Sequence, residues 1–117
     1  MEINDVVPAL AALAQENRLQ VFRLLVEAGN EGVAAGQVAE QLGIPSPTLS
    51  FHLAQLRHAG LVVVRREGRS LIYAANYERM NALIGFLTEN CCGMGTTAPI
   101  CVPQPQTRTR KQVGGRR

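Results

Sequence analysis

The stretch S-P-T-L-S-F-H-L-A-Q-L-R-H-A-G-L-V, residues 46–62, decides the fold of this chain. Its apolar side chains recur at helical spacing, at Leu49, Leu53 and Leu56. Pro47 suits the first turn of a helix, because the N–H that proline lacks would be unpaired there in any case. Ser46 is the expected N-cap, and we expect the helix to run to Gly60. The pattern predicts an amphipathic helix that packs one face against a core.

The residues just before this helix complete a recognisable motif. Apolar positions repeat at Ala35, Val38, Ala39 and Leu42. Gly43 follows, where a left-handed residue commonly ends a helix. The sequence I-P-S-P at 44–47 contains two prolines, which exclude a continuous helix across the join. Two short helices joined by a tight turn are typical of a helix-turn-helix.

Further elements are predicted on both sides of this motif. Residues 6–14 and 16–28 carry two earlier helical patterns. Residues 61–75 contain two β-rich runs, L-V-V-V-R-R and L-I-Y-A-A, on either side of a turn at Glu67-Gly68. This arrangement is typical of a β-hairpin. A hairpin attached to a helix-turn-helix is a wing.

A last helix is expected after the hairpin, capped by Asn76. Its apolar face comprises Met80, Leu83, Ile84 and Leu87. The predicted fold class is therefore mainly α with a small β-hairpin wing (α+β). It is a winged helix-turn-helix with the order α-α-α-α-β-β-α.

Length and composition fit one domain with a substantial core, since the chain has 117 residues and is 46% hydrophobic. The N-terminus M-E-I-N-D is acidic where a secretory signal needs positive charge, and no apolar run approaches the ~20 residues of a membrane span. We therefore expect a cytoplasmic protein that does not contact a membrane.

Charge separates the C-terminal end from the rest of the chain. Residues 103–117 carry five of the twelve basic residues and no acidic one, which leaves seven basic and nine acidic side chains in residues 1–102. The net charge of +3 is thus no evidence of a basic surface on the domain. We expect residues 1–92 to form the DNA-binding and dimerisation domain, 93–102 an inducer-binding segment, and 103–117 a basic disordered tail. The tail is either a solvated end without a role or a site of general attraction to phosphates.

Over residues 8–92 the chain resembles the ArsR/SmtB family of winged-helix metal-responsive repressors. The matching stretches are L-A-Q-E-N-R-L-Q-V-F-R-L-L at 13–25, residues 46–62, and R-R-E-G-R at 65–69. One departure is Gln15-Glu16-Asn17, where the family frequently has Asp-Pro-Thr. The resemblance implies a homodimer formed through the first and last helices. It also implies double-stranded operator DNA with an imperfect palindrome as the partner.

The same resemblance places the start of the 46–60 helix in the major groove of DNA. The expected DNA-binding residues are Ser46, Thr48, Ser50, Phe51, His52, Gln55, Arg57, Arg65, Arg66 and Arg69. Phe51 either touches a thymine methyl group or contacts the neighbouring turn, and the arginines either bind phosphates or are merely solvated. Glu67 argues against uniform attraction to phosphates. His52 and His58 lie on different faces of the helix, which disfavours a metal site between them.

Three cysteines, Cys91, Cys92 and Cys101, are the candidate metal ligands. Structural zinc takes four ligands and disulfide scaffolds take an even number of cysteines, so three thiols fit neither pattern. Two metal sites common in the family are missing, because residues 33–40 contain no Cys-x-Cys pair and the last helix contains no histidine. The trio resembles instead the arsenic-responsive subgroup with cysteines just past the last helix.

The chemistry of the three thiols favours As(III) or Sb(III) as inducer. Arsenous acid exchanges three hydroxyl groups for three thiols and gives a neutral product. Zinc with three thiolates would be negative at a helix C-terminus, where the helix dipole disfavours anions, and no Lys or Arg lies between Arg79 and Arg108. The three ligands lie within eleven residues, which favours a site within one subunit.

The expected function is that of a DNA-binding repressor released from its operator by trivalent arsenic or antimony. A thiol-redox-responsive regulator and a Zn/Cd-responsive regulator remain open alternatives, as does a constitutive DNA-binding module with incidental cysteines. An enzyme is not expected, because no cysteine stands in a phosphate-cradling loop or at a helix N-terminus. No organic cofactor is expected.

Overall fold

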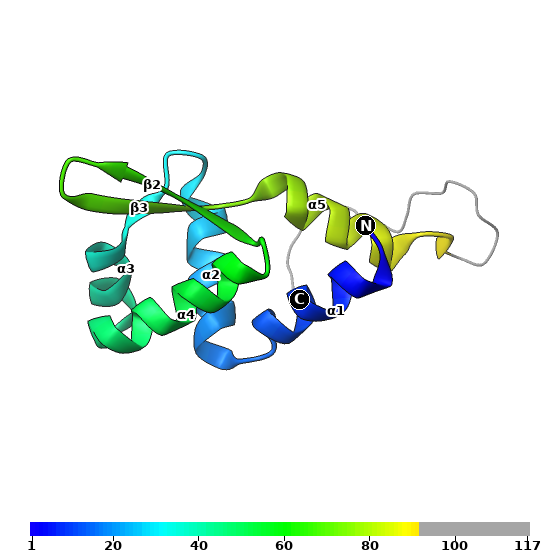
Figure 1. Cartoon of the computed structure of the whole chain (residues 1–117), viewed down its shortest axis with the longest axis horizontal. Coiled ribbons are helices and arrows are strands. Elements are labelled where there is room, and N and C mark those ends of the chain that lie inside the picture. The colour runs from blue at the N-terminus through cyan, green and yellow to red at the C-terminus, as the bar shows by residue number, and fades with distance from the viewer. Residues whose placement is uncertain (92–117) are drawn as a thin grey trace, which may run out of the picture. The chain divides into compact units, whose positions relative to one another are not determined.

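The computed structural model describes residues 1–91, and Figure 1 shows how their helices and strands are arranged. The chain divides into two units, residues 1–86 and 87–117. In chain order the elements are α1 (Ile3–Leu13), α2 (Glu16–Ala28), β1 (Val33–Ala34), α3 (Ala35–Leu42), α4 (Ser46–His58), β2 (Val62–Glu67), β3 (Ser70–Ala75) and α5 (Tyr77–Thr88). No helix within residues 1–91 is long and apolar enough to cross a membrane.

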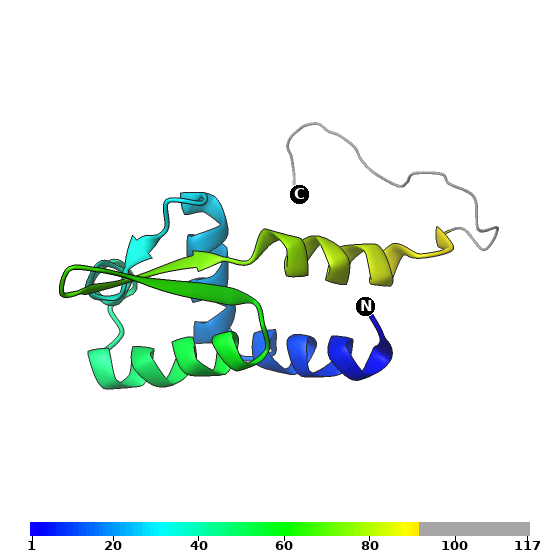
Figure 2. The ribbon, with the colours of Figure 1, turned by 45° about the horizontal axis from the view of Figure 1, so that its top comes forward.

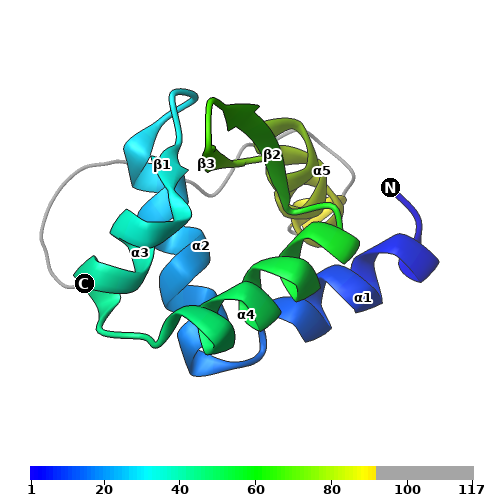
Figure 3. The same cartoon turned by 60° about the vertical axis from the view of Figure 1, so that its left-hand side comes forward.

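The core forms where α4 packs against the helices around it. α4 contacts α1, α2, α3 and β2, and Figure 3 shows α2 and α3 beside it. The predicted apolar face of α4 is confirmed, since Leu49, Leu53 and Leu56 are all buried. Other fully buried side chains around them are Val6, Val21, Leu25, Val38, Leu61 and Val62. The winged helix-turn-helix predicted from the apolar spacing is the observed fold.

The sheet has three strands in the order β1-β3-β2, which adds one short strand to the predicted element order. The predicted hairpin is present, with Val62 opposite Ala75 and Glu67 opposite Ser70. The additional strand, β1, comprises only two residues and pairs antiparallel with β3. A two-residue strand has no periodicity of its own, so only its pairing with a distant strand reveals it.

Some of the predicted helix caps are observed in the structure and one is not. Gly43 ends α3 in the left-handed conformation, with φ +66°, as predicted. Asn76 caps α5 as predicted, because its Oδ1 accepts a hydrogen bond of 3.1 Å from the backbone N–H of Arg79. The expected N-cap at Ser46 is wrong, since Pro45 holds that position and Ser46 is the first residue of α4.

The hairpin and the helix-turn-helix are oriented together within residues 1–86. Figures 1 and 2 show the tip of the β2–β3 hairpin and the N-terminal end of α4 at the same end of this unit. The Asn76 side chain joins the two elements at their other end, because its Nδ2 donates a hydrogen bond of 2.9 Å to the carbonyl of Gly60, just after α4. The fold therefore presents the start of α4 and the hairpin tip on a common side.

Candidate nucleic-acid interface

The outward face of α4 carries most of the residues predicted to meet DNA. Ser46, Thr48, Ser50, Gln55 and Arg57 are all exposed. Phe51 is 58% exposed, and its ring contacts that of His52 in an edge-to-face arrangement with 5.9 Å between centroids. Hydroxyl and amide groups on one helix face are suitable donors and acceptors for base edges and phosphates. The structure therefore presents these residues to solvent, and their contact with DNA stays a prediction.

His52 does not lie where a DNA-binding residue of α4 is expected. Its side chain is only 7% exposed, and its Nδ1 has no hydrogen-bond partner among the described residues. The reason is that α4 is packed on several sides, so the buried arc of the helix is wider than the Leu49, Leu53 and Leu56 stripe. The His52 imidazole is thus a core group and does not lie on the face offered to DNA.

Burial also sets the charge state of His52. Desolvation lowers the pKa of His52 below its ordinary value of 6.5, and the nearby Arg18 guanidinium lowers it further. Both effects disfavour the protonated form. The folded protein therefore holds His52 neutral at pH values where a histidine in the unfolded chain has begun to take up a proton.

This difference predicts that stability falls on acidification. Below pH 6.5 the unfolded chain binds more protons at His52 than the folded chain, so the free energy of unfolding decreases as the pH falls toward the lowered pKa. We expect His52→Leu to remove part of this decrease when urea unfolding is measured at pH 7.5 and 5.5. His58→Gln, at an exposed histidine on the same helix, is the control and should retain it. An equal decrease in wild type and His52→Leu would contradict the prediction.

The three wing arginines, Arg65, Arg66 and Arg69, are exposed but not equivalent. Arg65 forms an ion pair with Glu67, with 2.7 Å between Nε and Oε2. Its Nη2 also donates a hydrogen bond of 2.8 Å to the backbone carbonyl of Glu31. Within residues 1–91, neither Arg66 nor Arg69 forms an ion pair. Two of the three arginines are therefore available for phosphates.

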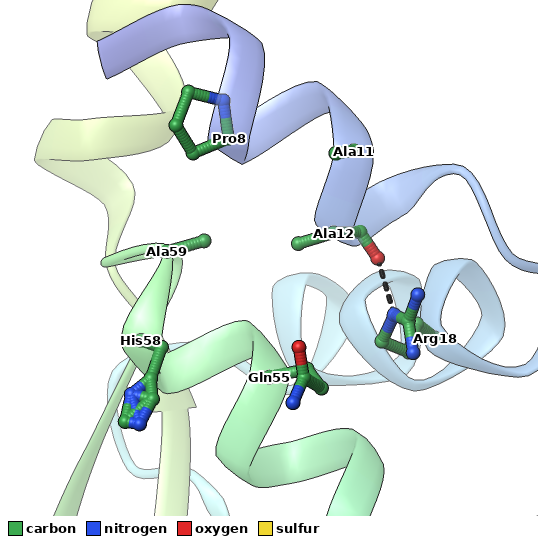
Figure 4. A pocket seen from close by; sticks show the side chains of 7 residues that line it. All are labelled: Pro8, Ala11, Ala12, Arg18, Gln55, His58 and Ala59. Carbon is green, nitrogen blue, oxygen red and sulfur yellow. Dashed lines mark hydrogen bonds between the residues drawn. The ribbon is translucent and has the colours of Figure 1, made fainter. Parts of the chain in front are cut away.

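A groove of about 360 Å³ lies beside the second half of α4. Figure 4 shows Ala12 of α1 and Ala59 facing each other across it. Arg18 lines the groove and donates a hydrogen bond of 2.7 Å from its Nε to the Ala12 carbonyl in the last turn of α1. A cation at a helix C-terminus is stabilised by the helix dipole. Arg18 thus anchors α1 to α2 beside the second half of α4.

An apolar surface suited to a second subunit covers parts of α1 and α5. Exposed apolar side chains there include Ile3, Val7 and Leu10 on α1 and Ile84 on α5. Beside them is a groove of about 400 Å³ lined by Leu13, Leu19, Phe22, Arg23, Val26, Glu27, Met80, Leu83 and Ile84. Exposed apolar side chains that gather on one surface usually mark a protein interface. The surface predicted for dimerisation is therefore apolar and open to solvent.

Of the three candidate metal ligands, only Cys91 belongs to the described residues, where it is half-buried. Cys92 and Cys101 lie outside them, as do the predicted segments 93–102 and 103–117. α5 ends at Thr88, and Asn90 adopts a left-handed conformation with φ +58°. Cys91 thus lies three residues beyond the end of α5, directly after a left-handed residue. Among residues 1–91, no three His, Cys, Asp or Glu side chains are grouped as metal ligands.

Comparison with known proteins agrees with the fold. A family model described as a helix-turn-helix domain matches residues 13–65. The chain is 37% identical over 79 residues to the transcriptional regulator KmtR of Mycobacterium tuberculosis, covering 68% of this chain and 58% of KmtR. It is 35% identical over 86 residues to the transcriptional activator HlyU of Vibrio cholerae, covering 74% of this chain and 77% of HlyU.

A solved structure shows the same fold in a dimer. The homodimeric winged helix-turn-helix domain of Mb0332 from Mycobacterium bovis, described as a possible ArsR-family regulator, has a TM-score of 0.61. It is 32% identical, with 75% of this chain and 82% of that chain covered. The protein is thus a winged helix-turn-helix of the class found in transcriptional regulators, which are not enzymes. Within that class, the chain belongs to the ArsR family.

Proposed function

We propose that the protein is a transcriptional repressor that binds operator DNA as a homodimer and is released by trivalent arsenic or antimony. DNA binding is supported by one observation: the polar face of α4 is exposed, and so are Arg66 and Arg69 on the hairpin, which form no ion pair within residues 1–91. The helix can offer hydrogen bonds to base edges, and the arginines can bind the flanking phosphates. His52 is not among the proposed contacts because it is buried.

Dimerisation follows from the apolar surface and from the homodimeric relative. Val7 is 58% exposed and Ile84 is 50% exposed, which is unusual for side chains that gain about 1.5–3 kcal/mol on full burial. A two-fold dimer places two α4 helices on two half-sites of a palindrome. Two protomers per operator are therefore the expected stoichiometry.

The proposed inducer site comprises Cys91, Cys92 and Cys101. Three thiols would replace the three hydroxyl groups of As(OH)₃, so that three As–O bonds break, three As–S bonds form, and each hydroxyl leaves as water with a thiol proton. The left-handed Asn90 supports this proposal, because a residue in that conformation ends the helical geometry of α5 before Cys91. Closing the loop from Cys92 to Cys101 costs on the order of 2 kcal/mol, which three metalloid–sulfur bonds can offset.

Arsenite is expected to weaken operator binding through these thiols. Allosteric couplings of about 1–3 kcal/mol are typical, which corresponds to about 5–150-fold weaker DNA binding. The measurement is fluorescence anisotropy of a labelled operator under reducing conditions, with arsenite titrated into wild type and Cys101→Ser. We expect release of wild type and little release of the variant.

The same anisotropy assay, repeated with an oxidant or with zinc or cadmium in place of arsenite, separates the alternative functions. Equal release of both proteins, or release of neither, would contradict the three-thiol site. Release by an oxidant without arsenite would favour a redox-responsive regulator, and release by zinc or cadmium alone would favour a divalent-metal regulator. Glu89→Gln, an isosteric change at an exposed residue two positions before Cys91, is the control near the site and should be released by arsenite like wild type.

A further inference from the structure

Arg65 lies at one end of a row of three residues that crosses the whole sheet. In the register of the strands, Arg65 of β2 stands opposite Ile72 of β3, and Ile72 in turn stands opposite Ala34 of β1. The segment just before β1 is the turn that follows α2 and contains Glu31. The Arg65 side chain therefore joins β2 to a segment on the far side of β3, through the 2.8 Å hydrogen bond from its Nη2 to the Glu31 carbonyl.

The close approach of that turn depends on Gly32. A Cβ atom at Gly32 would lie 2.6 Å from the carbonyl oxygen of Tyr73 and 2.8 Å from Cγ2 of Ile72. Residues with a side chain essentially never approach so closely, and the φ of Gly32 is +78°, a conformation that favours glycine. The missing side chain thus lets the turn rest on β3, where the Glu31 carbonyl comes within reach of Arg65.

The remaining interaction of Arg65 neutralises its charge locally. Arg65 and Glu67 are two residues apart on β2, so they project from the same face of the strand, and their ion pair is 2.7 Å long. Arg66 projects from the opposite face and forms no ion pair within the described residues. The guanidinium of Arg65 is therefore engaged on two sides, whereas those of Arg66 and Arg69 are not.

We infer that Arg65 is a positioning residue, which holds the wing against the turn before the helix-turn-helix and does not itself bind DNA phosphates. This inference rests on the proposed DNA-binding function. The turn leads directly into β1 and α3, so the contact couples the orientation of the hairpin to that of α3 and α4. The Arg65 and Glu67 side chains are 46% and 58% exposed, so the ion pair contributes little to global stability. The interactions of Arg65 instead determine the positions of Arg66 and Arg69 on the hairpin.

Substitution with lysine distinguishes positioning from direct contact. Arg65→Lys keeps the positive charge but loses the planar guanidinium that bonds in two directions at once. If Arg65 is a positioning residue, Arg65→Lys and Arg65→Gln should both bind operator about five- to tenfold more weakly, a loss of about 1 to 1.4 kcal/mol. If Arg65 instead binds phosphate as a point charge, Arg65→Lys should bind like wild type, and that result overturns the inference.

The salt dependence of binding provides the matched control. The slope of log K against log salt is about −0.9 per phosphate neutralised, so Arg69→Gln should reduce its magnitude by about 1 to 2 in a dimer. If Arg65 positions the wing, Arg65→Lys should also reduce the slope, because Arg66 and Arg69 lose part of their contact with phosphates. A wild-type slope in Arg65→Lys, which keeps the charge at position 65, overturns the inference. Unchanged urea midpoints in all variants would show that none of these effects arises from unfolding.

A measurement without DNA tests the positioning role of Arg65 independently of the proposed DNA-binding function. Backbone ¹⁵N relaxation of the hairpin residues should show increased motion in Arg65→Lys and in Glu67→Gln, but not in Arg69→Gln. Unchanged hairpin motion in Arg65→Lys would contradict the positioning role. Wild type that fails to bind any operator would contradict the proposed function alone, because the relaxation result does not depend on DNA.

Discussion

Leu56→Ala is expected to lower the free energy of unfolding by about 2–5 kcal/mol, the range for truncating a buried leucine. Leu56 is 0% exposed and lies on the face of α4 that packs into the core. The loss comprises the transfer free energy of the removed methyl groups and the cost of the cavity they leave. Because small domains are stable by only about 5–15 kcal/mol, a large part of the protein should be unfolded at moderate urea concentrations.

The matched control is Phe51→Ala on the opposite face of the same helix. Phe51 is 58% exposed, so its truncation should change stability by about 0.5 kcal/mol or less while weakening operator binding. The measurement is urea unfolding followed by circular dichroism, at one fixed protein concentration because dimerisation makes apparent stability depend on concentration. Equal destabilisation by the two substitutions would show that the core does not lie where the structure places it.

Gly32→Ala is expected to lower the free energy of unfolding by about 2–4 kcal/mol. Left-handed backbone costs a residue with a side chain on the order of 1–3 kcal/mol, and the clash of the new Cβ with the Tyr73 carbonyl adds an overpacking cost of about 1 kcal/mol or more. The neighbour at 2.6 Å is backbone in a paired strand, so it cannot move aside without disturbing the β1–β3 pairing. The measurement is again urea unfolding.

Gly43→Ala separates these two contributions. Gly43 is also left-handed, with φ +66°, but a Cβ there would meet no atom within 4 Å. Gly43→Ala should therefore pay only the cost of the left-handed backbone, and its free energy of unfolding should fall clearly less than that of Gly32→Ala. Equal losses at both positions would show that the close approach at Tyr73 contributes nothing to stability.

Regular spacing along the chain was sufficient to predict most of the fold. The leucines at 49, 53 and 56 predicted the buried face of α4, and the two β-rich runs around Glu67-Gly68 predicted the hairpin. Gly43 and Asn76 predicted helix ends because their preferences act within a few residues. These features depend on local backbone geometry, which a single sequence carries in full.

The candidate interface was predicted less completely. Exposure of Thr48, Ser50 and Phe51 follows from the helical period, but the burial of His52 depends on how many neighbours surround α4. The pairing of Arg65 with the Glu31 carbonyl joins residues 34 positions apart. No repeat or composition signal in the sequence connects two such positions. The glycine at position 32 was the available hint, since a glycine before a strand permits a close backbone approach.

The sequence by itself determined the class of fold, the outward face of α4 and the set of three thiols that suggests an inducer. Each of these depends on residue type and on spacing within about one turn or one strand. Only the tertiary structure decided that His52 belongs to the core, that a third strand joins the wing, and that Arg65 is held while Arg66 and Arg69 are available. Those features depend on contacts between segments far apart in the chain, which form only when burial of the shared core brings the segments together.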